Sequence, residues 1–484
     1  MDTMETARTV RACNYCWDIP QTGDMRVPGR VFADEDLLKL AQRDSTLSQV
    51  RNVAHLPGII RCSLAMPDMH WGYGFPIGGV AATDPDNGGV ISPGGIGYDI
   101  NCGVRLIRSN LAHEEILNRL HLLVQTLFKT IPCGVGARSS LHLSWSELKA
   151  ALRGGSQWAV AEGYGINEDV ELCENRGTMS EANPAKVSDR ALKRGCDQLG
   201  TLGSGNHFLE IDTVEEVYDQ EAAQTLGLFS GQVVVMIHSG SRGLGYQVCD
   251  EYIVAMRAAV KKYNIPLPDR QLSCAPFASR EGQDYFAAMA AAANFAWANR
   301  QLITHQTRKV FRQVLNAGKQ ELGLSLVYDV CHNIGKLENH RIGNHYKKVL
   351  VHRKGATRAF PPGHPDTPAR YKKCGQPVLI PGDMGTHSYV LVGQEQSMCE
   401  TWGSTCHGAG RVLSRTAAKK KAHGRAIEHE LSSAGILVLA RRRETLAEEM
   451  PAAYKDINQV VNVVEQTGLS RRVARLRPLA VIKG

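Results

Sequence analysis

Short apolar runs along the chain predict strands that are buried on both faces. These runs occupy residues 233–237, 324–327, 349–351 and 378–380. A short apolar run bounded by polar or turn residues is typical of a strand inside a layered sheet. Each run leads into a polar group, and these groups contain His238, His332, Lys354 and Asp383. A polar turn explains any one group, but four such strand ends predict a site at the edge of a sheet.

The longest helical pattern covers residues 284–316. Its apolar side chains step by three and four positions, as on one face of an α-helix, and include Phe286, Ala290, Ala293 and Trp297. We interpret this stripe as a packing face. Because strands and helices do not alternate in a regular βαβ order, the predicted class is α+β. We expect one large domain with central β-sheets flanked by helices and a dinuclear metal and nucleotide site at the strand ends.

The composition is that of an ordinary globular protein. The chain has 484 residues, 43% hydrophobic and 21% charged, which is ample for a large core. We find no apolar stretch long enough for a membrane span, and the polar residues 1–24 do not resemble a secretory signal. Thirteen scattered cysteines predict reduced thiols and an intracellular, cytoplasmic location. Cys13 and Cys16 are a weak zinc signal, and ordinary thiols are the simpler interpretation.

Positive charge is concentrated late in the chain. The net charge is +8, and basic residues cluster at 419–421, 441–443 and 471–477. This distribution favours a polyanionic partner such as nucleic acid. Each cluster alone also fits a solvated helix face.

His407 lies in a run of small residues that spans positions 403–410. Small neighbours allow a ligand or another backbone to come close. The following residues 411–425 predict a basic helix, and a helix N-terminus just after His407 would attract an anion. The run therefore fits a histidine that handles phosphate. It fits equally well a helix cap made by Ser404 or Thr405, with His407 incidental.

Candidate metal ligands recur in glycine-rich or strand-end settings. They are Asp99, Cys102, His207, His238 and His332. A carboxylate, a thiolate and three imidazoles suit one or two transition metals, and the thiolate can bridge two. Paired metals serve phosphoryl chemistry. The set suits zinc as well as manganese, and any single histidine also fits a hydrogen-bonded core position.

Together, several longer segments resemble the RtcB family of GTP-dependent RNA ligases. These segments are residues 66–72, 97–103, 203–207, 238–243, 352–358, 403–411 and 481–484. The resemblance extends from about residue 25 to residue 484. It therefore implies an RNA ligase domain over 25–484, preceded by an N-terminal extension over 1–24.

The resemblance implies that RNA 3′-phosphate or 2′,3′-cyclic phosphate ends are joined to 5′-hydroxyl ends, in tRNA splicing or RNA repair. GTP and two Mn²⁺ per active site are the implied cofactors, and tRNA halves or broken RNA ends are the implied partners. An activating partner protein is compatible with this picture, and a membrane has no part in it. His407 is the implied nucleophile, which is guanylylated and passes GMP to the RNA 3′-phosphate before the 5′-hydroxyl displaces it.

The resemblance also assigns individual residues. Asp99, Cys102 and His207 match the ligands of one manganese; Cys102, His238 and His332 match those of the second, with Cys102 bridging. Asp68 matches a position beside the metals. The implied GTP and phosphate contacts are Asn206, Glu210, Arg242, Asn333, Lys354, Pro381, Gly382, Asp383, Met384, Ser388, Gly408, Ala409, Gly410, Tyr454 and Lys483.

One position departs from the family pattern, which usually has serine where this chain has Asp383. A carboxylate directed at phosphate would weaken GTP binding, whereas one directed at the guanine or ribose would be harmless.

Two other functions fit parts of the pattern. A dinuclear metal phosphoesterase would use the same metal ligands without needing His407 or Lys483. An RNA-binding scaffold would need only the basic C-terminal third.

Overall fold

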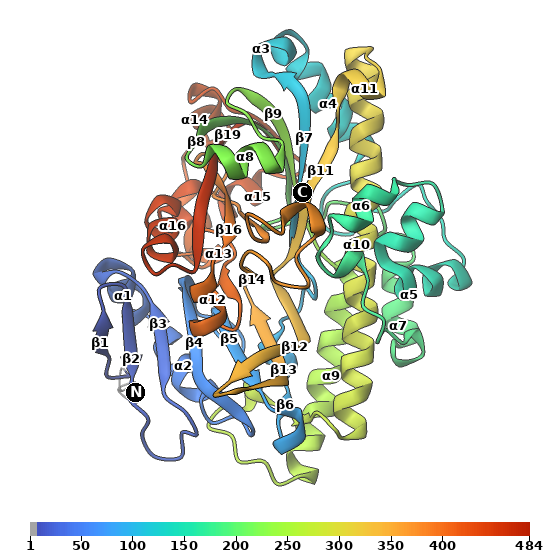
Figure 1. Ribbon diagram of the computed structural model, residues 1–484. Helices are drawn as coiled ribbons and strands as arrows, with labels where there is room; N and C mark the ends of the chain where they lie inside the picture. Colours follow the sequence, from blue (N-terminus) through green and yellow to red (C-terminus); the bar gives the residue numbers. More distant parts are fainter. Residues whose placement is uncertain (1–6) are drawn as a thin grey trace.

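Two large β-sheets form the centre of the molecule, which we describe from a computed structural model covering residues 7–484 (Figure 1). The first sheet has the order β1-β2-β3-β4-β5-β13-β12, and only β3 and β4 pair in parallel. Its strands are β1 Val10–Cys13, β2 Cys16–Ile19, β3 Gly29–Phe32, β4 Ile59–His70, β5 Ile77–Thr83, β13 His345–Lys354 and β12 Asn333–Ile342. The hairpin of β1 and β2 thus extends this sheet; the boundary proposed near residue 25 stays a prediction.

The second sheet has the order β11-β7-β9-β8-β19-β16-β15, with β18 paired to β19. Its strands are β11 Ser325–Cys331, β7 Gly103–Ala112, β9 Gln232–Ser239, β8 Phe208–Val217, β19 Ser470–Lys483, β16 Ser388–Gly393, β15 Pro377–Ile380 and β18 Leu437–Ala440. Two small ribbons pair β14 Ala356–Arg358 with β17 Ser404–Cys406, and β6 Val90–Ile91 with β10 Ala275–Pro276. The four apolar runs all lie within or against these strands, in β9, β11, β13 and β15.

Helices surround the sheets, so the α+β class is confirmed. They are α1 Glu35–Gln42, α2 Thr46–Val53, α3 His113–Ile116, α4 Leu120–Thr130, α5 Trp145–Ala161, α6 Asn167–Glu171, α7 Asp189–Gly195, α8 Gln220–Leu226, α9 Arg242–Lys262, α10 Arg280–Leu315, α11 Lys319–Leu322, α12 Glu395–Glu400, α13 Arg415–Ala422, α14 Ile427–Ser433, α15 Arg443–Glu448 and α16 Ile457–Gln466. Figure 1 shows α5, α7, α9 and α10 gathered along one side of the sheets. None of the helices in the described range 7–484 combines the length and the apolar character that a membrane span requires.

The helical pattern at 284–316 is confirmed as α10, whose stripe is buried. The helix predicted at 411–425 is shorter and begins later than expected. It is α13, and its N-cap is Ser414, whose hydroxyl accepts from the backbone N–H of Ala417 at 3.1 Å. His407 instead follows strand β17, which contains Ser404 and Thr405. The expected helix N-terminus directly behind His407 and the two expected caps were therefore wrong.

The N-terminal cysteine pair also differs from expectation. Cys13 and Cys16 face each other across the turn between β1 and β2 and are joined by a disulfide. Neither the weak zinc interpretation nor the expectation of reduced thiols holds for this pair. The eleven other cysteines are free.

Candidate active site and metal centre

The five predicted metal ligands lie together at one edge of the second sheet. Cys102 Sγ is 3.4 Å from His207 Nε2 and 3.2 Å from His238 Nε2. His238 Nε2 is 3.3 Å from His332 Nε2, and His207 Nε2 is 2.7 Å from Asp99 Oδ2. Residues separated by as many as 233 positions, Asp99 and His332, thus form one cluster.

Strand register explains why these residues meet. Gly103, the first residue of β7, pairs with Ser239 on β9 and with Cys331 on β11. Phe208, the first residue of β8, pairs with His238. Cys102, His207 and His332 each lie one residue outside a paired strand end, so the sheet holds all the ligands at the same edge. His332 also lies between β11 of the second sheet and β12 of the first.

The donor atoms fit a pair of transition-metal ions. Two sets, Asp99–Cys102–His207 and Cys102–His238–His332, each have their ligand atoms within 4.8 Å of one another, and they share Cys102. Burial lowers the pKa of His238 and His332, which keeps both imidazoles neutral and able to donate a lone pair. Burial, and then the nearby Asp99 carboxylate, raises the pKa of the Cys102 thiol. A bound dication would reverse that preference, because the thiolate is the ligand form.

A buried arginine that the sequence did not single out holds the backbone next to two of the candidate ligands. Arg300, on α10, is fully buried and donates to the backbone carbonyls of Asn101 at 2.8 Å and Ser239 at 2.9 Å. Asp329 accepts from Arg300 at 2.8 and 2.9 Å and from Arg105 at 2.7 Å. Because Asn101 and Ser239 adjoin Cys102 and His238, α10 fixes the backbone of two ligands. An arginine inside an apolar helix stripe carries no sequence signal for this role.

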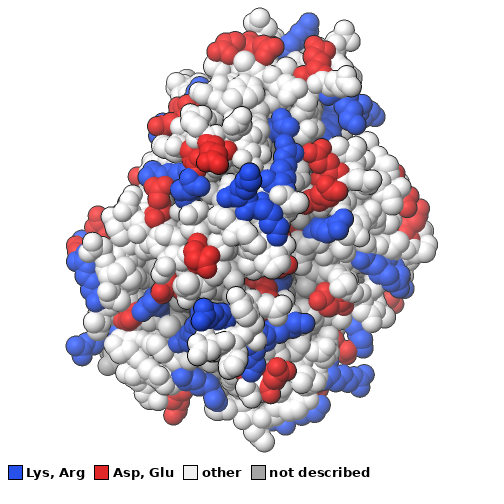
Figure 2. Space-filling view, viewed as in Figure 1, with Lys and Arg blue, Asp and Glu red and all other residues white. Residues whose placement is uncertain are grey.

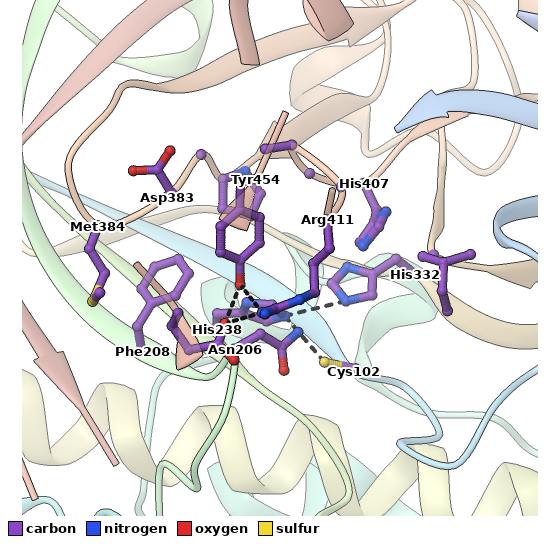
Figure 3. A pocket seen from close by; sticks show the side chains of 18 of the residues that line it. Cys102, Asn206, Phe208, His238, His332, Asp383, Met384, His407, Arg411 and Tyr454 are labelled. Atoms are coloured by element: carbon purple, nitrogen blue, oxygen red, sulfur yellow. Dashed lines mark hydrogen bonds and ion pairs between the residues drawn. The ribbon is translucent and has the colours of Figure 1, made fainter. Parts of the chain in front are cut away.

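His407 is held by a buried carboxylate. Asp68 Oδ2 accepts from the backbone N–H of His407 at 2.9 Å and also from its ring Nδ1. This contact leaves Nε2 as the ring nitrogen without a bond to Asp68. Asp68 was expected beside the metals; its contact is with His407, whose ring packs edge-on against His332 at a centroid distance of 4.8 Å. Figure 3 shows His407 next to His332, with Cys102 and His238 nearby.

Lys455 ties together the two segments that carry Asp68 and His407. Its ammonium group donates to the carbonyl of Pro67 at 3.0 Å and to that of Met69. Its backbone N–H donates to the carbonyl of Gly410 at 2.9 Å. Gly410 has φ +72°, and a Cβ there would lie 2.0 Å from the carbonyl oxygen of Asp68, so only glycine fits.

A cavity of about 250 Å³ opens between these groups. It is lined by the ligands Asp99, Cys102, His238 and His332, by His407, and by most of the predicted nucleotide contacts. These contacts are Asn206, Glu210, Asn333, Pro381, Gly382, Asp383, Met384, Gly408, Ala409, Gly410, Tyr454 and Lys483. The structure therefore brings the candidate metal centre, His407 and this set of residues to one cavity.

Among the described residues, three of the predicted GTP and phosphate contacts do not line the cavity. Arg242 donates from Nε to Thr201 Oγ1 at 3.2 Å. Lys354 donates to the carbonyls of Tyr73 and Phe75, and burial lowers its pKa to about 7. The hydroxyl of Ser388 accepts from the backbone N–H of Gly382 at 3.1 Å, so Ser388 supports the wall rather than facing the cavity.

Several cavity residues were not predicted from the sequence as site residues. They are His70, Ile77, Phe208, Gly355, Arg411, Arg415 and Glu449. Arg411 donates to the hydroxyl of Tyr454 at 3.2 Å (Figure 3). Arg411 also donates to Glu449 at 3.0 Å, and the Tyr454 hydroxyl donates to Glu449. Arg411 directly follows the small-residue run 403–410 and was interpreted from the sequence as the start of a helix. Glu449 stands in no recognisable pattern.

Asp383 does not direct its carboxylate at the metal cluster. It accepts from the backbone N–H of Gly385 at 2.8 Å and from the hydroxyl of Thr386 at 2.9 Å. Figure 3 shows the carboxylate turned away from Cys102 and His332. Burial raises its pKa, and the bonds to Gly385 and Thr386 only partly offset that effect.

Some residues of the late basic clusters form ion pairs with acidic residues. Lys419 lies 2.6 Å from Glu448, and Arg475 lies 3.0 Å from Glu215. Figure 2 shows blue and red side chains interleaved over the visible face, with one longer basic group near its upper middle. These ion pairs reduce the net positive charge that the clusters 419–421 and 471–477 present.

Comparison with known proteins identifies the family. The family model described as tRNA-splicing ligase RtcB matches residues 49–484. The tRNA-splicing ligase RtcB of Thermococcus kodakarensis is 55% identical over 469 residues, covering 97% of this chain and 97% of the relative. That of Archaeoglobus fulgidus is 52% identical, covering 97% and 98%. The RNA-splicing ligase RtcB of Mycobacterium tuberculosis is 52% identical over 438 residues, covering 90% of this chain and all of the relative. The chain belongs to the RtcB family.

Proposed function

We propose that this protein is an RNA ligase that joins RNA 3′-phosphate or 2′,3′-cyclic phosphate ends to 5′-hydroxyl ends, with GTP as the energy source and manganese as the metal. The proposal rests first on family membership, since the relatives are named tRNA-splicing or RNA-splicing ligases. Within the structure, one observation carries it: a carboxylate-held histidine lies beside two overlapping sets of metal ligands in one cavity.

The Asp68 contact suits His407 to be a nucleophile. With Nδ1–H donated to Asp68, the lone pair is on Nε2, and the carboxylate stabilises the positive charge that develops on the ring. We infer that Nε2 attacks the α-phosphate of GTP, so that a nitrogen–phosphorus bond forms and pyrophosphate leaves. The GMP then passes to an RNA 3′-phosphate oxygen, and a 5′-hydroxyl displaces GMP to close the phosphodiester. A cyclic phosphate is first opened by water.

The metals would be held by Asp99, Cys102 and His207 and by Cys102, His238 and His332. When bound, they would supply positive charge that neutralises phosphate oxygens, which is the main requirement of phosphoryl transfer. The protein contributes fixed positions, because strand register and Arg300 hold the ligand backbone and Asp68 holds the nucleophile.

Two residues of the cavity lining, Glu210 and Lys483, suit a guanine base. Glu210 is 3% exposed, and burial and then the neighbouring Asp212 raise its pKa. A carboxyl group there can pair with the N–H donors of guanine, and Lys483 can donate to its carbonyl oxygen. Lys483 now donates to the carbonyl of Gly205 at 3.0 Å. Adenine offers the opposite pattern on this edge, which gives a physical reason to expect GTP rather than ATP.

The test is covalent labelling. The protein, manganese and α-phosphate-labelled GTP are incubated, denatured and separated by electrophoresis, and we expect an acid-labile label on the wild type. His407→Ala should abolish the label while bound metal stays near the wild-type amount, and His423→Ala, at an exposed histidine, should keep both. A phosphoesterase or a scaffold would give no label in a folded, metal-loaded wild type, and a label that persists in His407→Ala would remove His407 from this role.

A further inference from the structure

We propose that Tyr246, supported by Tyr98, is a platform on which one base of the RNA strand stacks beside the metal centre. This inference rests on the proposed function, since it names a binding surface for the RNA that such a ligase joins. The platform lies outside the cavity residues, and no part of the chemistry described above uses it.

The two tyrosine rings form a stack that is open to solvent. Their centroids are 4.9 Å apart with an interplanar angle of 24°, and Tyr73 packs edge-on against Tyr98 at 5.7 Å. Tyr246 is 46% exposed, whereas Tyr73 and Tyr98 are partly buried. Tyr98 and Tyr73 therefore hold the Tyr246 ring in a fixed orientation while leaving much of it uncovered. A single exposed aromatic residue needs no explanation, but a supported stack preorganises a binding surface.

The platform adjoins the ligand cluster through the backbone. Tyr98 directly precedes the candidate ligand Asp99, whose carboxylate accepts from the backbone N–H of Ser241 at 3.0 Å. Ser241 is the N-cap of α9, and Tyr246 lies on the second turn of this helix, four residues after Arg242. Positions four apart share one face of a helix, about 6 Å along its axis. Tyr246 therefore lies close to the helix end whose N-cap bonds Asp99, and an RNA end at the candidate metal centre would pass near it.

The charge around the stack favours a nucleic acid. The exposed Arg194 side chain lies over the Tyr246 ring, with its guanidinium carbon 5.3 Å from the ring centre, so a stacking base would share this face with Arg194 or displace it. Arg257 donates to the Tyr73 hydroxyl at 3.2 Å. Arg190 and Lys193 are exposed on α7, which packs against α9. Asp250 is the exposed acidic residue one turn beyond Tyr246 on α9. Aromatic faces next to arginines and lysines are the usual surface for single-stranded nucleic acids, because every base has a π-face and every linkage a phosphate.

The test measures RNA binding directly by fluorescence anisotropy, without GTP, so it does not depend on catalysis. Tyr246→Ala should weaken binding of an RNA end by roughly 5- to 100-fold, as expected for the loss of one stacked base. Tyr246→Phe should bind like the wild type, because the ring is kept. Tyr346→Ala, at a tyrosine that is 78% exposed on β13, is the control and should change nothing. Guanylylation of His407 should stay normal in all three variants, so that a failure of the proposed chemistry is distinguishable from a failure of the platform.

Abasic substrates separate stacking from a structural role. Removing the base at the first or second nucleotide from the 5′-hydroxyl or the 3′-phosphate should weaken binding to the wild type and to Tyr246→Phe. At the stacked position the same removal should have little further effect on Tyr246→Ala, because the two changes delete the same contact. Wild-type affinity in Tyr246→Ala, or full additivity at every abasic position, would overturn the proposal.

Discussion

The orientation of His407 depends on one buried side chain. Asp68 is fully buried, and its Oδ2 accepts from both the backbone N–H and the ring Nδ1 of His407. This arrangement selects the tautomer whose free lone pair is on Nε2. A residue far from His407 in the sequence, and not a metal ligand, thereby decides which atom of the histidine faces the cavity.

At Cys102 we expect substitution to disrupt both metal positions. Cys102→Ala removes the only atom shared by the two ligand sets, so bound manganese should fall from two ions to one or none per chain. Metal analysis after dialysis measures this directly, and covalent labelling should fall with it. Cys374→Ala, at another buried free cysteine, should retain full metal. Two retained ions in Cys102→Ala would contradict the bridging role.

At Asp383 we expect only a modest effect. Asp383→Ser removes the carboxylate that accepts from Gly385 and Thr386, which loosens the loop, but it also removes an acidic group from the cavity proposed to bind GTP. These effects oppose each other, so the Kd for GTP should change by less than about tenfold, or about 1.4 kcal/mol. Equilibrium binding of GTP to the variant measures the change. A product other than joined RNA would show that this loop was misinterpreted.

At the residue scale, the candidate metal ligands stood out in the sequence where polar residues lie in distinctive patterns, and their roles stay predictions. Asp99, Cys102 and His207 stand in glycine-rich segments, and the structure brings them together with His238 and His332. Arg300, Lys455 and Glu449 carry no such mark, because each has a partner that is distant in the sequence. Arg300 bonds Asn101, 199 positions away, Lys455 bonds Pro67, 388 positions away, and Glu449 bonds Arg411, 38 positions away. Side chains that act on a neighbour's backbone are therefore the ones that sequence patterns do not reveal.

At the scale of elements, strand register places the candidate metal ligands at one sheet edge, and α10 fixes the backbone next to two of them, Cys102 and His238. Short apolar runs predicted β9, β11, β13 and β15, because a buried strand needs apolar residues on both faces. The pairing of Gly103 with Ser239 and Cys331 was not predictable, since register depends on partners distant in sequence. The helix predicted at 411–425 was wrong at its start. The residues before His407 form strand β17, and Gly410, after it, packs closely against the backbone of Asp68.

The role of α10 can be tested at Arg300. Arg300→Lys keeps the charge beside Asp329 but cannot reach the carbonyls of Asn101 and Ser239 and both carboxylate oxygens together. We expect manganese affinity to fall roughly 10- to 100-fold, which is typical when a group that orients a ligand is lost. Isothermal titration with manganese provides the measurement. Lys309→Ala, at an exposed position on the same helix, should leave affinity unchanged, and normal affinity in Arg300→Lys would contradict this role.

At the scale of the whole molecule, the site depends on how the two sheets are held together. His332 lies between β11 of the second sheet and β12 of the first, and Glu174 spans the same junction. The carboxylate of Glu174 accepts from the backbone N–H of Cys331 at 3.0 Å and from the ammonium of Lys336 at 2.5 Å. Arg358 lies 3.5 Å from the same carboxylate. One fully buried charge thus connects β11, β12 and β14.

This junction should make stability depend on pH. Burial alone would raise the pKa of Glu174, but Lys336 and Arg358 outweigh it and lower that pKa from 4.5 to about 2. A lowered pKa means that the ionised form is favoured by folding, so the contribution is fully present above pH 4.5 and is lost as the pH falls toward 2. A shift of this size corresponds to about 3 kcal/mol of unfolding free energy.

Glu174→Gln keeps the shape and the acceptor for Cys331 but leaves Lys336 buried without its counter-charge. We expect it to destabilise the protein at pH 7 by roughly 3–5 kcal/mol, as for a broken buried pair. The Tm difference from wild type should shrink as the pH is lowered from 5 toward 3, because the Glu174 carboxyl then becomes protonated in the unfolded wild type while it stays ionised in the folded protein, so its ionisation favours folding less. Glu168→Gln, at an exposed pair with Arg370, should shift Tm little at any pH. A Tm difference for Glu174→Gln that stays constant from pH 7 to pH 3 would mean that the charge of Glu174 does not hold the two sheets together.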